Sequence, residues 1–511
     1  MINTEYYMKK YIKIAIATIA GAVMVTSCDL NLVPNSSIVY QEDGVLIQTQ
    51  SNLNSLENGL LSSFRSRQNG RYVEAPEFQF DYYNATVDYG NNYGALHKSD
   101  YNLTSGDYDV EAMWSGNYSS IKNYNIFIAA AENVENESIK ANVDVVKGEA
   151  YFFRAWSYLQ LARHFGKQYS SSASTDLCVP IVLVYDQAEQ PARATVAEVY
   201  AQIKSDLDQA ASLLAGVKGA VRSKKPTIDA VNALYARYFL DIADYANAAS
   251  YAHKVIDTGT YKMAATAEEM TKEYVNDNGT EPIMQLAISL TEFTGNTLNN
   301  WTLCQSDANY GQAFRSYFIP TQTLIDSYED GDLRFDAWFN GTTAVMMSGS
   351  YYNLDKTDFY TFTKFWGNPD LTSSPIRNGR TAPKPFKISE MYLIAAEAEL
   401  AAGNTAAAKA DLNAIQAARG ASLTDATTAT VRNEWFKETV GEGQRKFCLK
   451  RWGVGFSGRV MQPGAANILQ QGDVFNDKVF PAGSPLFEWP VPAYEMKINK
   501  NLVQNPGYDA L

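Results

Sequence analysis

The chain has 511 residues, of which 46% are hydrophobic and 19% are charged, a composition that indicates a folded protein and excludes an intrinsically disordered one. The formal net charge of −13 disfavours nucleic acid and anionic lipid as partners. The three histidines (His97, His164 and His253) are far apart and the four cysteines form no Cys-x-x-Cys pair, which disfavours a metal site, a histidine base and a redox motif.

The first 27 residues have the pattern of a secretory signal peptide. A basic segment at 8–13 precedes an apolar run at 14–25, which is too short to span a membrane. The Val-Thr-Ser sequence at 25–27 and Cys28 resemble a bacterial lipobox, which implies cleavage before Cys28 and acylation of its thiol. We therefore expect a mature single domain at 28–511, held to a membrane only by lipid. The alternative is an ordinary signal peptide with an incidental cysteine.

Helical periodicity dominates two parts of the chain, at about 114–258 and 387–455. The segment 147–166 carries apolar and aromatic side chains on two faces, so we expect it inside a helical array. Helix hairpins rich in small residues at 227–258 and 387–419 resemble tetratricopeptide units. Further helices are predicted at 45–66, 114–133, 143–165, 195–214 and 427–452, and a short strand is predicted at 179–183.

Two long stretches, 67–113 and 260–385, sustain no helical period and are rich in Tyr, Asn, Asp and Gly. We expect irregular loops there, and long ordered loops usually carry function. Pro490 and Pro492 lead us to expect no helix in the C-terminal segment at 487–508. The predicted fold class is therefore mainly α, with a tetratricopeptide-like helical scaffold, long irregular loops and few short strands.

Five motifs occur in a fixed order along the chain. They are Cys28 followed by Asp29, Leu30 and Pro34; the helix at 147–166; the run EMYLIAAEA at 390–398; Glu438, Glu442 and Arg445 with KRWG at 450–453; and PVP at 490–492 with Glu495 and NPGY at 505–508. Together they resemble the SusD/RagB family of Bacteroidetes outer-membrane nutrient-binding lipoproteins. The resemblance covers essentially the whole chain.

The resemblance implies a lipid-anchored protein of the outer membrane that captures a glycan at the cell surface for starch or glycan utilization. It implies a partner similar to SusC, a TonB-dependent transporter, and binding without catalysis. The alternatives are a peptide ligand, as in the RagB branch, a surface glycoside hydrolase, and a purely structural lid for the channel. The family has no fixed ligand-contacting motif, so the resemblance indicates which regions of the chain would contact the ligand but not which residues.

The chemistry of sugars indicates where a binding site would lie. Sugars present apolar C–H faces and rims of hydroxyl groups, so their sites combine aromatic rings with Asn, Asp, Gln or Arg. Two stretches, 81–93 and 296–317, supply both. We predict ligand contacts from Asp81, Tyr82, Tyr83, Asn84, Tyr89, Asn92, Tyr93, Trp301, Asp307, Tyr310, Arg315 and Tyr317. The alternative for each ring is that it packs a loop onto the helices.

Two other motifs are interpreted as structural. The sequence GVGFSG at 453–458 matches G-x-G-x-x-G, but a charged helix precedes it and Pro463 follows it, so we expect a helix exit and not a dinucleotide site. Glu434, Glu438 and Glu442 recur every four residues beside basic residues, which favours an ion-pair network over a glycosidase acid pair. Acidic loop residues follow no ligand pattern, so no cofactor is predicted and Ca²⁺ binding is left open.

Overall fold

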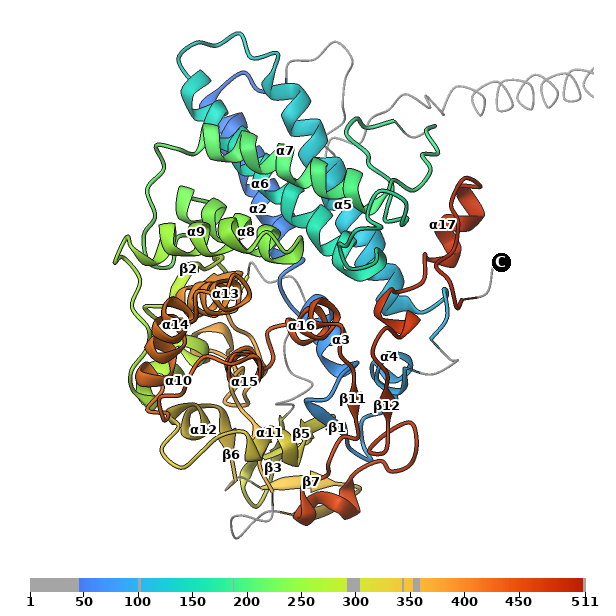
Figure 1. The fold of residues 1–511 in the computed structure, drawn as a ribbon, viewed down its shortest axis with the longest axis vertical. Helices are drawn as coiled ribbons and strands as arrows, with labels where there is room; N and C mark the ends of the chain where they lie inside the picture. The colour runs from blue at the N-terminus through green and yellow to red at the C-terminus, as the bar shows by residue number, and fades with distance from the viewer. Residues whose placement is uncertain are drawn as a thin grey trace, which may run out of the picture. The chain divides into compact units, whose positions relative to one another are not determined.

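Helices are the dominant secondary structure (Figure 1). The structure is a computed structural model that describes residues 46–99, 103–186, 188–291, 304–341, 344–352 and 359–508. The scaffold helices are α2 (Gln50–Arg65), α5 (Tyr108–Ala131), α6 (Lys140–Phe165), α7 (Val196–Leu213), α8 (Ile228–Asp241), α9 (Tyr245–Ile256), α13 (Ile388–Ala401), α14 (Thr405–Ala418), α15 (Thr428–Glu438) and α16 (Arg445–Trp452). Each of α5 to α9 packs on the next, and α13 packs on α8, α9, α14 and α15. The predicted mainly helical fold with few short strands is confirmed.

Helix α6 lies inside this array, as its two apolar faces predicted. It packs on α2, α5 and α7, and Phe64 of α2 stacks on Phe153 with ring centroids 4.6 Å apart. Two arginines of α6 are also buried, because each finds a carboxylate partner on a neighbouring helix. Arg154 donates to Asp206 of α7 at 2.6 and 2.9 Å, and Arg163 donates to Asp241 of α8 at 2.6 and 2.9 Å.

The two predicted helix hairpins are confirmed as α8–α9 and α13–α14. Thr227 caps α8 and Asp244 caps α9, while Gly403 with a φ of +85° makes the turn before α14. The prediction of a single helix at 427–452 is wrong. The segment forms two helices, α15 and α16, because Gly441 and Gly443 in the connection adopt φ values of +78° and +72°. This left-handed conformation ends a helix.

Three further segments differ in detail from the prediction. The predicted loop at 67–113 contains α3 (Arg71–Phe78) and α4 (Gly94–Lys98) and the start of α5. The segment 179–183 is extended but forms no strand, because the carbonyls of Pro180 and Val182 accept hydrogen bonds from side chains of α5 and α6. The expectation of no helix at 487–508 is wrong: α17 (Ala493–Ile498) begins directly after Pro492, because a proline interrupts the interior of a helix but is compatible with its start.

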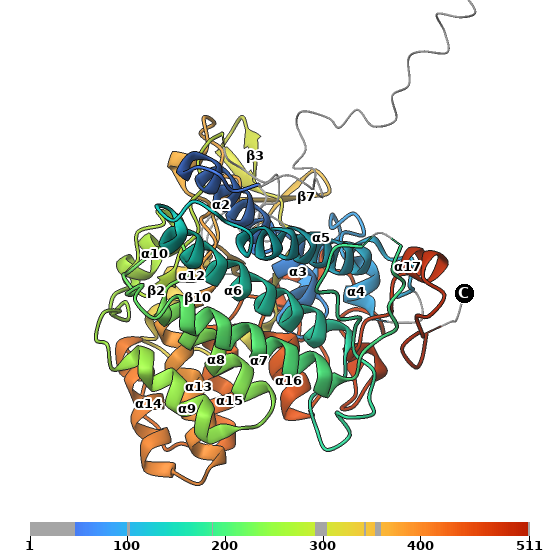
Figure 2. The same cartoon turned by 90° about the horizontal axis from the view of Figure 1, so that it is seen from above.

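The strands are short, and β3 and β7 lie far from the helix pair α9 and α14 in both views (Figures 1 and 2). Strand β1 (Tyr83–Ala85) pairs with β5 (Phe318–Pro320), β2 (Pro282–Met284) with β10 (Phe386–Lys387), β6 (Phe339–Asn340) with β9 (Thr361–Phe362) and β11 (Phe456–Ser457) with β12 (Val479–Phe480). A four-stranded sheet has the order β3 (Cys304–Asp307), β4 (Gly311–Phe314), β7 (Val345–Met347) and β8 (Ser350–Tyr352). Three short helices belong to the same part of the chain: α10 (Ala267–Val275) precedes β2, and α11 (Gln322–Asp326) and α12 (Leu333–Trp338) follow β5.

No helix in the described ranges is both long enough and apolar enough to cross a membrane. The predicted signal peptide at 1–27 and the predicted lipidation site Cys28 lie outside the described residues.

Candidate functional site

The two stretches predicted to bind ligand lie side by side, although more than two hundred residues separate them in sequence. Strand β1 of the first stretch pairs antiparallel with β5, which follows the second, and Ala85 is opposite Phe318. The ladder continues beyond the strands, where the backbone N–H of Thr86 donates to the Tyr317 carbonyl at 2.9 Å. The predicted loops therefore meet along one short sheet.

Most of the first stretch is nevertheless buried, which corrects the expectation that its rings form a stacking platform. Tyr82 and Tyr83 are 0% exposed, and Asn84 is 1% exposed. Tyr82 stacks on Phe436 with ring centroids 4.7 Å apart, and its hydroxyl donates to the Phe436 carbonyl at 2.9 Å. Side chains without an exposed face cannot stack on a sugar, so these three pack the loop onto the scaffold, as the alternative interpretation held.

The neighbouring residues of the first stretch mainly support the loop. Tyr89 is buried against Phe318 and Phe475. The Asn92 amide donates to the Tyr89 carbonyl at 2.6 Å, which closes a turn. The Tyr93 hydroxyl donates to Glu74 at 2.8 Å, and its backbone has a φ of +51°.

Asp81 lies at the opposite end of β1, in an open groove of about 550 Å³. Its carboxylate accepts two hydrogen bonds from Arg445 at 2.6 and 2.7 Å. Arg432, Asn433 and Trp452 line the same groove. Asp81 therefore faces a different part of the surface from the residues that follow β1.

The exposed members of both stretches gather on the β3–β4 and β7–β8 hairpins. We call this the hairpin surface and define it by Asp88, Asp307, Asn309, Tyr310, Arg315, Ser348 and Tyr351. Tyr310 is 49% exposed, and its ring meets that of Tyr351 at a centroid distance of 5.2 Å and an angle of 60°. The two rings and the polar groups around them offer both apolar faces and hydrogen-bonding atoms.

Hydrogen bonds hold the ring pair in place. The Tyr351 hydroxyl donates to the Asp307 carboxylate, which also accepts from the backbone N–H groups of Asn309 and Tyr310 at 2.9 and 3.0 Å. The bond from Tyr351 lowers the pKa of Asp307 and raises the pKa of Tyr351. Asp307 thus stays ionised and pins the turn that presents Tyr310.

A second cluster joins the first stretch to the same surface. The Arg315 guanidinium lies 3.3 Å from the Asp88 carboxylate and is 48% exposed. Asp88 also accepts from the backbone N–H of Ser348 at 3.0 Å, in a turn where Ser348 has a φ of +49°. Tyr317 is half-buried against the aromatic core, and the predicted Trp301 lies outside the described residues.

Sequence reasoning did not include Tyr351 and Ser348 in the site. Tyr351 belongs to a Ser-Tyr-Tyr-Asn run at 350–353 whose composition matches that of the predicted stretches, and this is the signal that would have found it. No signal identifies Ser348, whose contribution is a backbone N–H.

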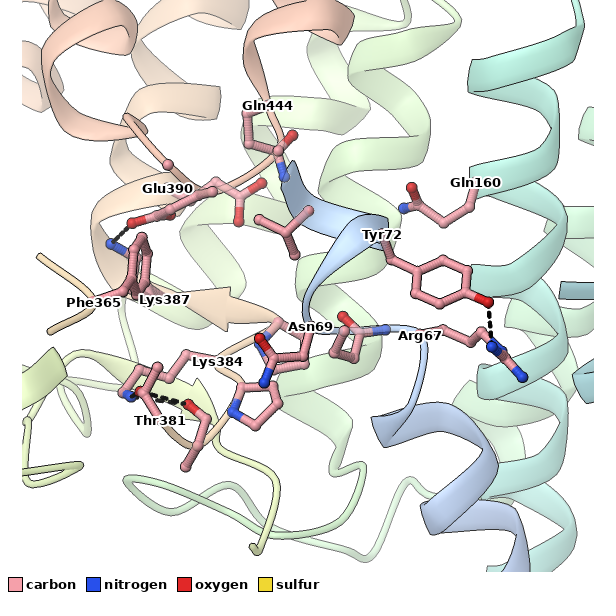
Figure 3. Close-up of a pocket in the computed structure, with 18 of the residues that line it drawn as sticks. Arg67, Asn69, Tyr72, Gln160, Phe365, Thr381, Lys384, Lys387, Glu390 and Gln444 are labelled. Carbon is pink, nitrogen blue, oxygen red and sulfur yellow. Dashed lines mark hydrogen bonds and ion pairs between the residues drawn. The ribbon is translucent and has the colours of Figure 1, made fainter. Parts of the chain in front are cut away.

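A smaller and more enclosed pocket lies among α3, α6 and the segment that leads to β10 (Figure 3). Its volume is about 90 Å³. Ligand pockets for drug-sized molecules are typically about 300–1,000 Å³, so this pocket is too small for a sugar ring. Polar side chains surround it, among them Arg67, Asn69, Tyr72, Gln160 and Gln444 (Figure 3).

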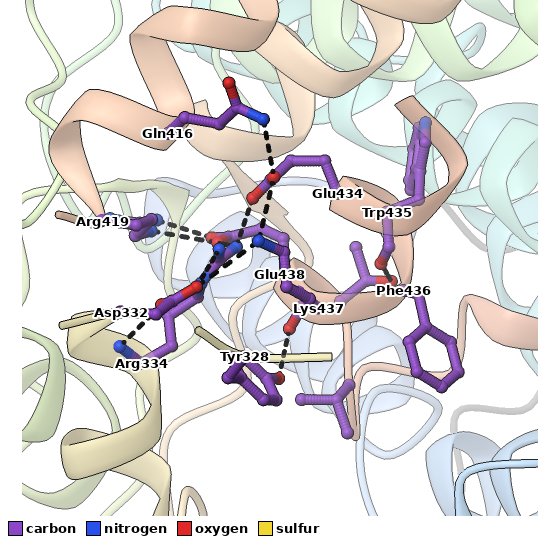
Figure 4. A network of polar contacts seen from close by, with 12 residues as sticks. Tyr328, Asp332, Arg334, Gln416, Arg419, Glu434, Trp435, Phe436, Lys437 and Glu438 are labelled. Carbon is purple, nitrogen blue, oxygen red and sulfur yellow. Dashed lines mark hydrogen bonds and ion pairs between the residues drawn. The ribbon is translucent and has the colours of Figure 1, made fainter. Parts of the chain in front are cut away.

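The carboxylates of α15 form a buried ion-pair network, as their spacing predicted (Figure 4). Glu434 and Glu438 are each 1% exposed, and both bind Arg334, at 2.5 and 3.1 Å. Burial alone would raise the pKa of Glu438, but Arg419, Lys387 and Arg334 hold it well below its usual range. Both carboxylates are buried and paired with Arg334, so they are inaccessible to a polysaccharide and cannot act as the acid pair of a glycosidase.

The remaining sequence motifs have structural roles. The G-x-G-x-x-G sequence begins at Gly453, which ends α16 with a φ of +62°, so the predicted helix exit is confirmed. Across the described part of the chain, no three His, Cys, Asp or Glu side chains are placed to hold a metal ion.

Comparisons with known proteins identify the family. A family model described as "Starch-binding associating with outer membrane" matches residues 30–240, and one described as "SusD family" matches residues 245–508. SusD-like protein P2 of Formosa agariphila is 25% identical over 443 residues, which are 80% of this chain and 83% of that protein. Starch-binding protein SusD of Bacteroides thetaiotaomicron is 24% identical over 457 residues, which are 76% of each chain.

The fold agrees with these matches. A solved SusD superfamily protein from Bacteroides thetaiotaomicron aligns with a TM-score of 0.74 at 23% identity, over 90% of this chain and 100% of that chain. Family models together cover the described chain almost from end to end. The chain belongs to the SusD/RagB family.

Proposed function

We propose that this protein is a cell-surface lipoprotein of the outer membrane that captures an oligosaccharide or polysaccharide and passes it to a SusC-like TonB-dependent transporter. The observation that carries the glycan proposal is the exposed ring of Tyr310, which packs against the half-buried ring of Tyr351 on the hairpin surface. The starch-binding descriptions of the matching family model and of the relative SusD support a carbohydrate as the ligand. The protein binds its ligand and does not cleave it.

The hairpin surface has the chemistry that a sugar requires. The exposed face of Tyr310 offers a platform for sugar C–H groups, and Tyr351 fixes its orientation. The guanidinium of Arg315 and the amide of Asn309 supply donors, while Asp88 and Asp307 supply acceptors. Because both carboxylates are already held by hydrogen bonds from their neighbours, a neutral sugar would meet preorganised partners and lose little affinity to reordering.

Calorimetric titration of the purified protein with a panel of neutral glycans tests the proposal. Tyr310→Ala removes the platform, so we expect affinity for the bound glycan to fall at least tenfold. Arg315→Gln should lower it by a smaller factor. Tyr494→Ala is the matched control, because Tyr494 is 59% exposed but lies on α17. An unchanged affinity in Tyr310→Ala, or binding of peptides with no response to any glycan, would refute the glycan assignment.

The anchor and the transporter are tested separately. Cys28→Ser should release the protein from the membrane fraction, since the predicted acylation site is its only proposed attachment. The wild-type protein should co-purify with a TonB-dependent transporter from mildly solubilised outer membranes. Retention of the serine variant in the membrane fraction without such a partner would contradict the lipid anchor.

A further inference from the structure

The small pocket among α3, α6 and the segment before β10 contains hydrogen-bond donors that lack acceptors. We call it the amide pocket and define it by Gln68, Asn69, Trp156, Gln160 and Gln444. The Trp156 side chain is 5% exposed, and its indole N–H finds no acceptor among the described residues. The same holds for the buried amide nitrogen of Gln68. A buried donor without an acceptor destabilises the folded state, so these donors call for an occupant that accepts hydrogen bonds.

The amides of Gln160 and Gln444 border the same space from α6 and from the segment before α16 (Figure 3). Asn69 also lines this space, is 4% exposed, and uses its carbonyl oxygen to accept from the Gly70 N–H at 3.0 Å. This bond leaves the two N–H donors of its amide available. The wall is thus rich in donors from three separate segments of the chain.

The charges of the pocket are not balanced. Lys384 is paired with Asp277 at 2.8 Å, Lys387 with Glu442 at 2.7 Å, and Arg237 with Glu390 at 2.6 Å. Arg67 donates instead to the hydroxyl groups of Tyr72 and Ser120, and no carboxylate in the described ranges forms an ion pair with it. The guanidinium lies 4.9 Å from the centroid of the Tyr72 ring, which holds it at the pocket wall.

From these donors and this single uncompensated charge we infer that the amide pocket binds an oxyanion group, a carboxylate or a sulfate. Such a group accepts several hydrogen bonds at once, and its negative charge would form an ion pair with Arg67. The volume of about 90 Å³ suits one such group and excludes a sugar ring. Water alone would satisfy the donors but would leave the charge of Arg67 without a partner.

The oxyanion has two sources, a free ion or an acidic substituent of a bound glycan, and one experiment separates them. Thermal unfolding of the full protein is followed at constant ionic strength with up to about 10 mM sodium acetate, sodium sulfate or an oligogalacturonate replacing chloride. A ligand that binds only the folded state raises Tm in proportion to the logarithm of its concentration above Kd. Stabilisation by acetate or sulfate assigns a free ion, and stabilisation by the oligogalacturonate alone assigns an acidic glycan substituent.

Two variants connect the response to the pocket. Arg67→Gln should weaken anion binding at least tenfold. Its control is Arg432→Gln, because the Arg432 guanidinium also lies over an aromatic ring, 5.0 Å from the Trp452 centroid. Like Arg67, Arg432 forms no ion pair with a carboxylate among the described residues. Trp156→Phe should weaken binding through loss of the indole N–H. Its control is Trp435→Phe, which removes another buried indole N–H without a described partner, outside the pocket.

The inference is overturned if no anion raises Tm relative to chloride, or if the shift is the same in Arg67→Gln and Trp156→Phe as in the wild type. In either case the pocket holds only water. Circular dichroism establishes that each variant is folded before its response is compared. Acetate and sulfate offer no sugar face for Tyr310, so Tyr310→Ala should leave the response to these free ions unchanged, and failure of this inference and failure of the glycan assignment are distinguishable.

Discussion

Replacing Glu442 by glutamine tests the electrostatic account of the scaffold. Glu442 lies 2.7 Å from both Lys364 and Lys387 and accepts from the Tyr274 hydroxyl at 2.7 Å. Burial alone would raise its pKa, but the two lysines lower it from 4.5 to about 2. Since one pKa unit corresponds to about 1.4 kcal/mol, ionised Glu442 stabilises the folded state by about 3 kcal/mol.

The sign of the pH dependence follows from the same values. The pKa of Glu442 is lower in the folded state, so its stabilisation is complete above pH 4.5 and is lost as the pH falls toward 2. Glu442→Gln should therefore lower the free energy of unfolding by about 3 kcal/mol at pH 7, and the deficit should be about 1.4 kcal/mol smaller at pH 3.5. Lys364, whose pKa burial lowers to about 8, loses its counter-charge in this variant.

Urea unfolding followed by tryptophan fluorescence at both pH values measures the effect. Glu137→Gln is the control, because Glu137 forms an exposed pair with Lys140 at 2.9 Å and such pairs contribute less than about 1 kcal/mol. A Glu442→Gln deficit below about 1 kcal/mol at pH 7, or one that does not change with pH, would refute the assignment of Glu442 as a stabilising counter-ion.

Three other changes have defined outcomes. Arg154→Met should destabilise by about 3–5 kcal/mol because it leaves Asp206 buried and unpaired, and the double variant with Asp206→Leu should recover part of this in urea unfolding. Gly441→Ala should lower Tm more than Gly453→Ala, because both have a positive φ but only at Gly441 would a Cβ lie 2.7 Å from a phenylalanine ring. The pKa of His253 is raised by its hydrogen bond to a carboxylate of α14, so its stabilising effect is present at pH 6 and lost as the pH rises through the folded pKa. NMR titration of His253 measures its pKa in the folded state. The difference in Tm between the wild type and His253→Gln, at pH 6 and again at a pH above that pKa, measures the stabilising effect.

The helical scaffold was predictable because its signals are local. The periodicity of 147–166 and the small residues of 227–258 follow directly from the geometry of one helix or one hairpin. The break between α15 and α16 was not predicted, because charged residues typical of a helix surface occur on both sides of it and within it. The glycines at 441 and 443 were the available signal, and their φ values show that they act as turns.

The candidate site was harder to predict because composition does not encode burial. Tyr82 and Tyr83 have the same residue types around them as Tyr310, yet their exposed fractions are 0%, 0% and 49%. The difference arises from β1, which pairs with β5 and is buried at all three positions, so neither face of this strand reaches solvent. An alternating pattern marks a half-buried strand, and a strand buried on both faces carries no such pattern.

The amide pocket could not be predicted from the sequence, because its walls come from α3, α6 and the segments before β10 and α16. Trp156 is one of several aromatic residues of α6 in the sequence, and only the packing around it leaves its indole N–H without an acceptor among the described residues. Long-range packing of this kind has no local signature.

The hairpin surface is stabilised by one set of interactions and the scaffold by another, so ligand binding and stability can be changed separately in this protein. Tyr351, Asp307 and Tyr310 bind mainly one another, whereas the scaffold depends on buried pairs such as Arg154 with Asp206. Substitution of Tyr310 should therefore change the free energy of unfolding by less than about 0.5 kcal/mol, as is usual for surface positions. A loss of glycan binding in Tyr310→Ala with unchanged Tm would then report on ligand contact alone. A parallel loss of both would instead mean that the ring supports the fold.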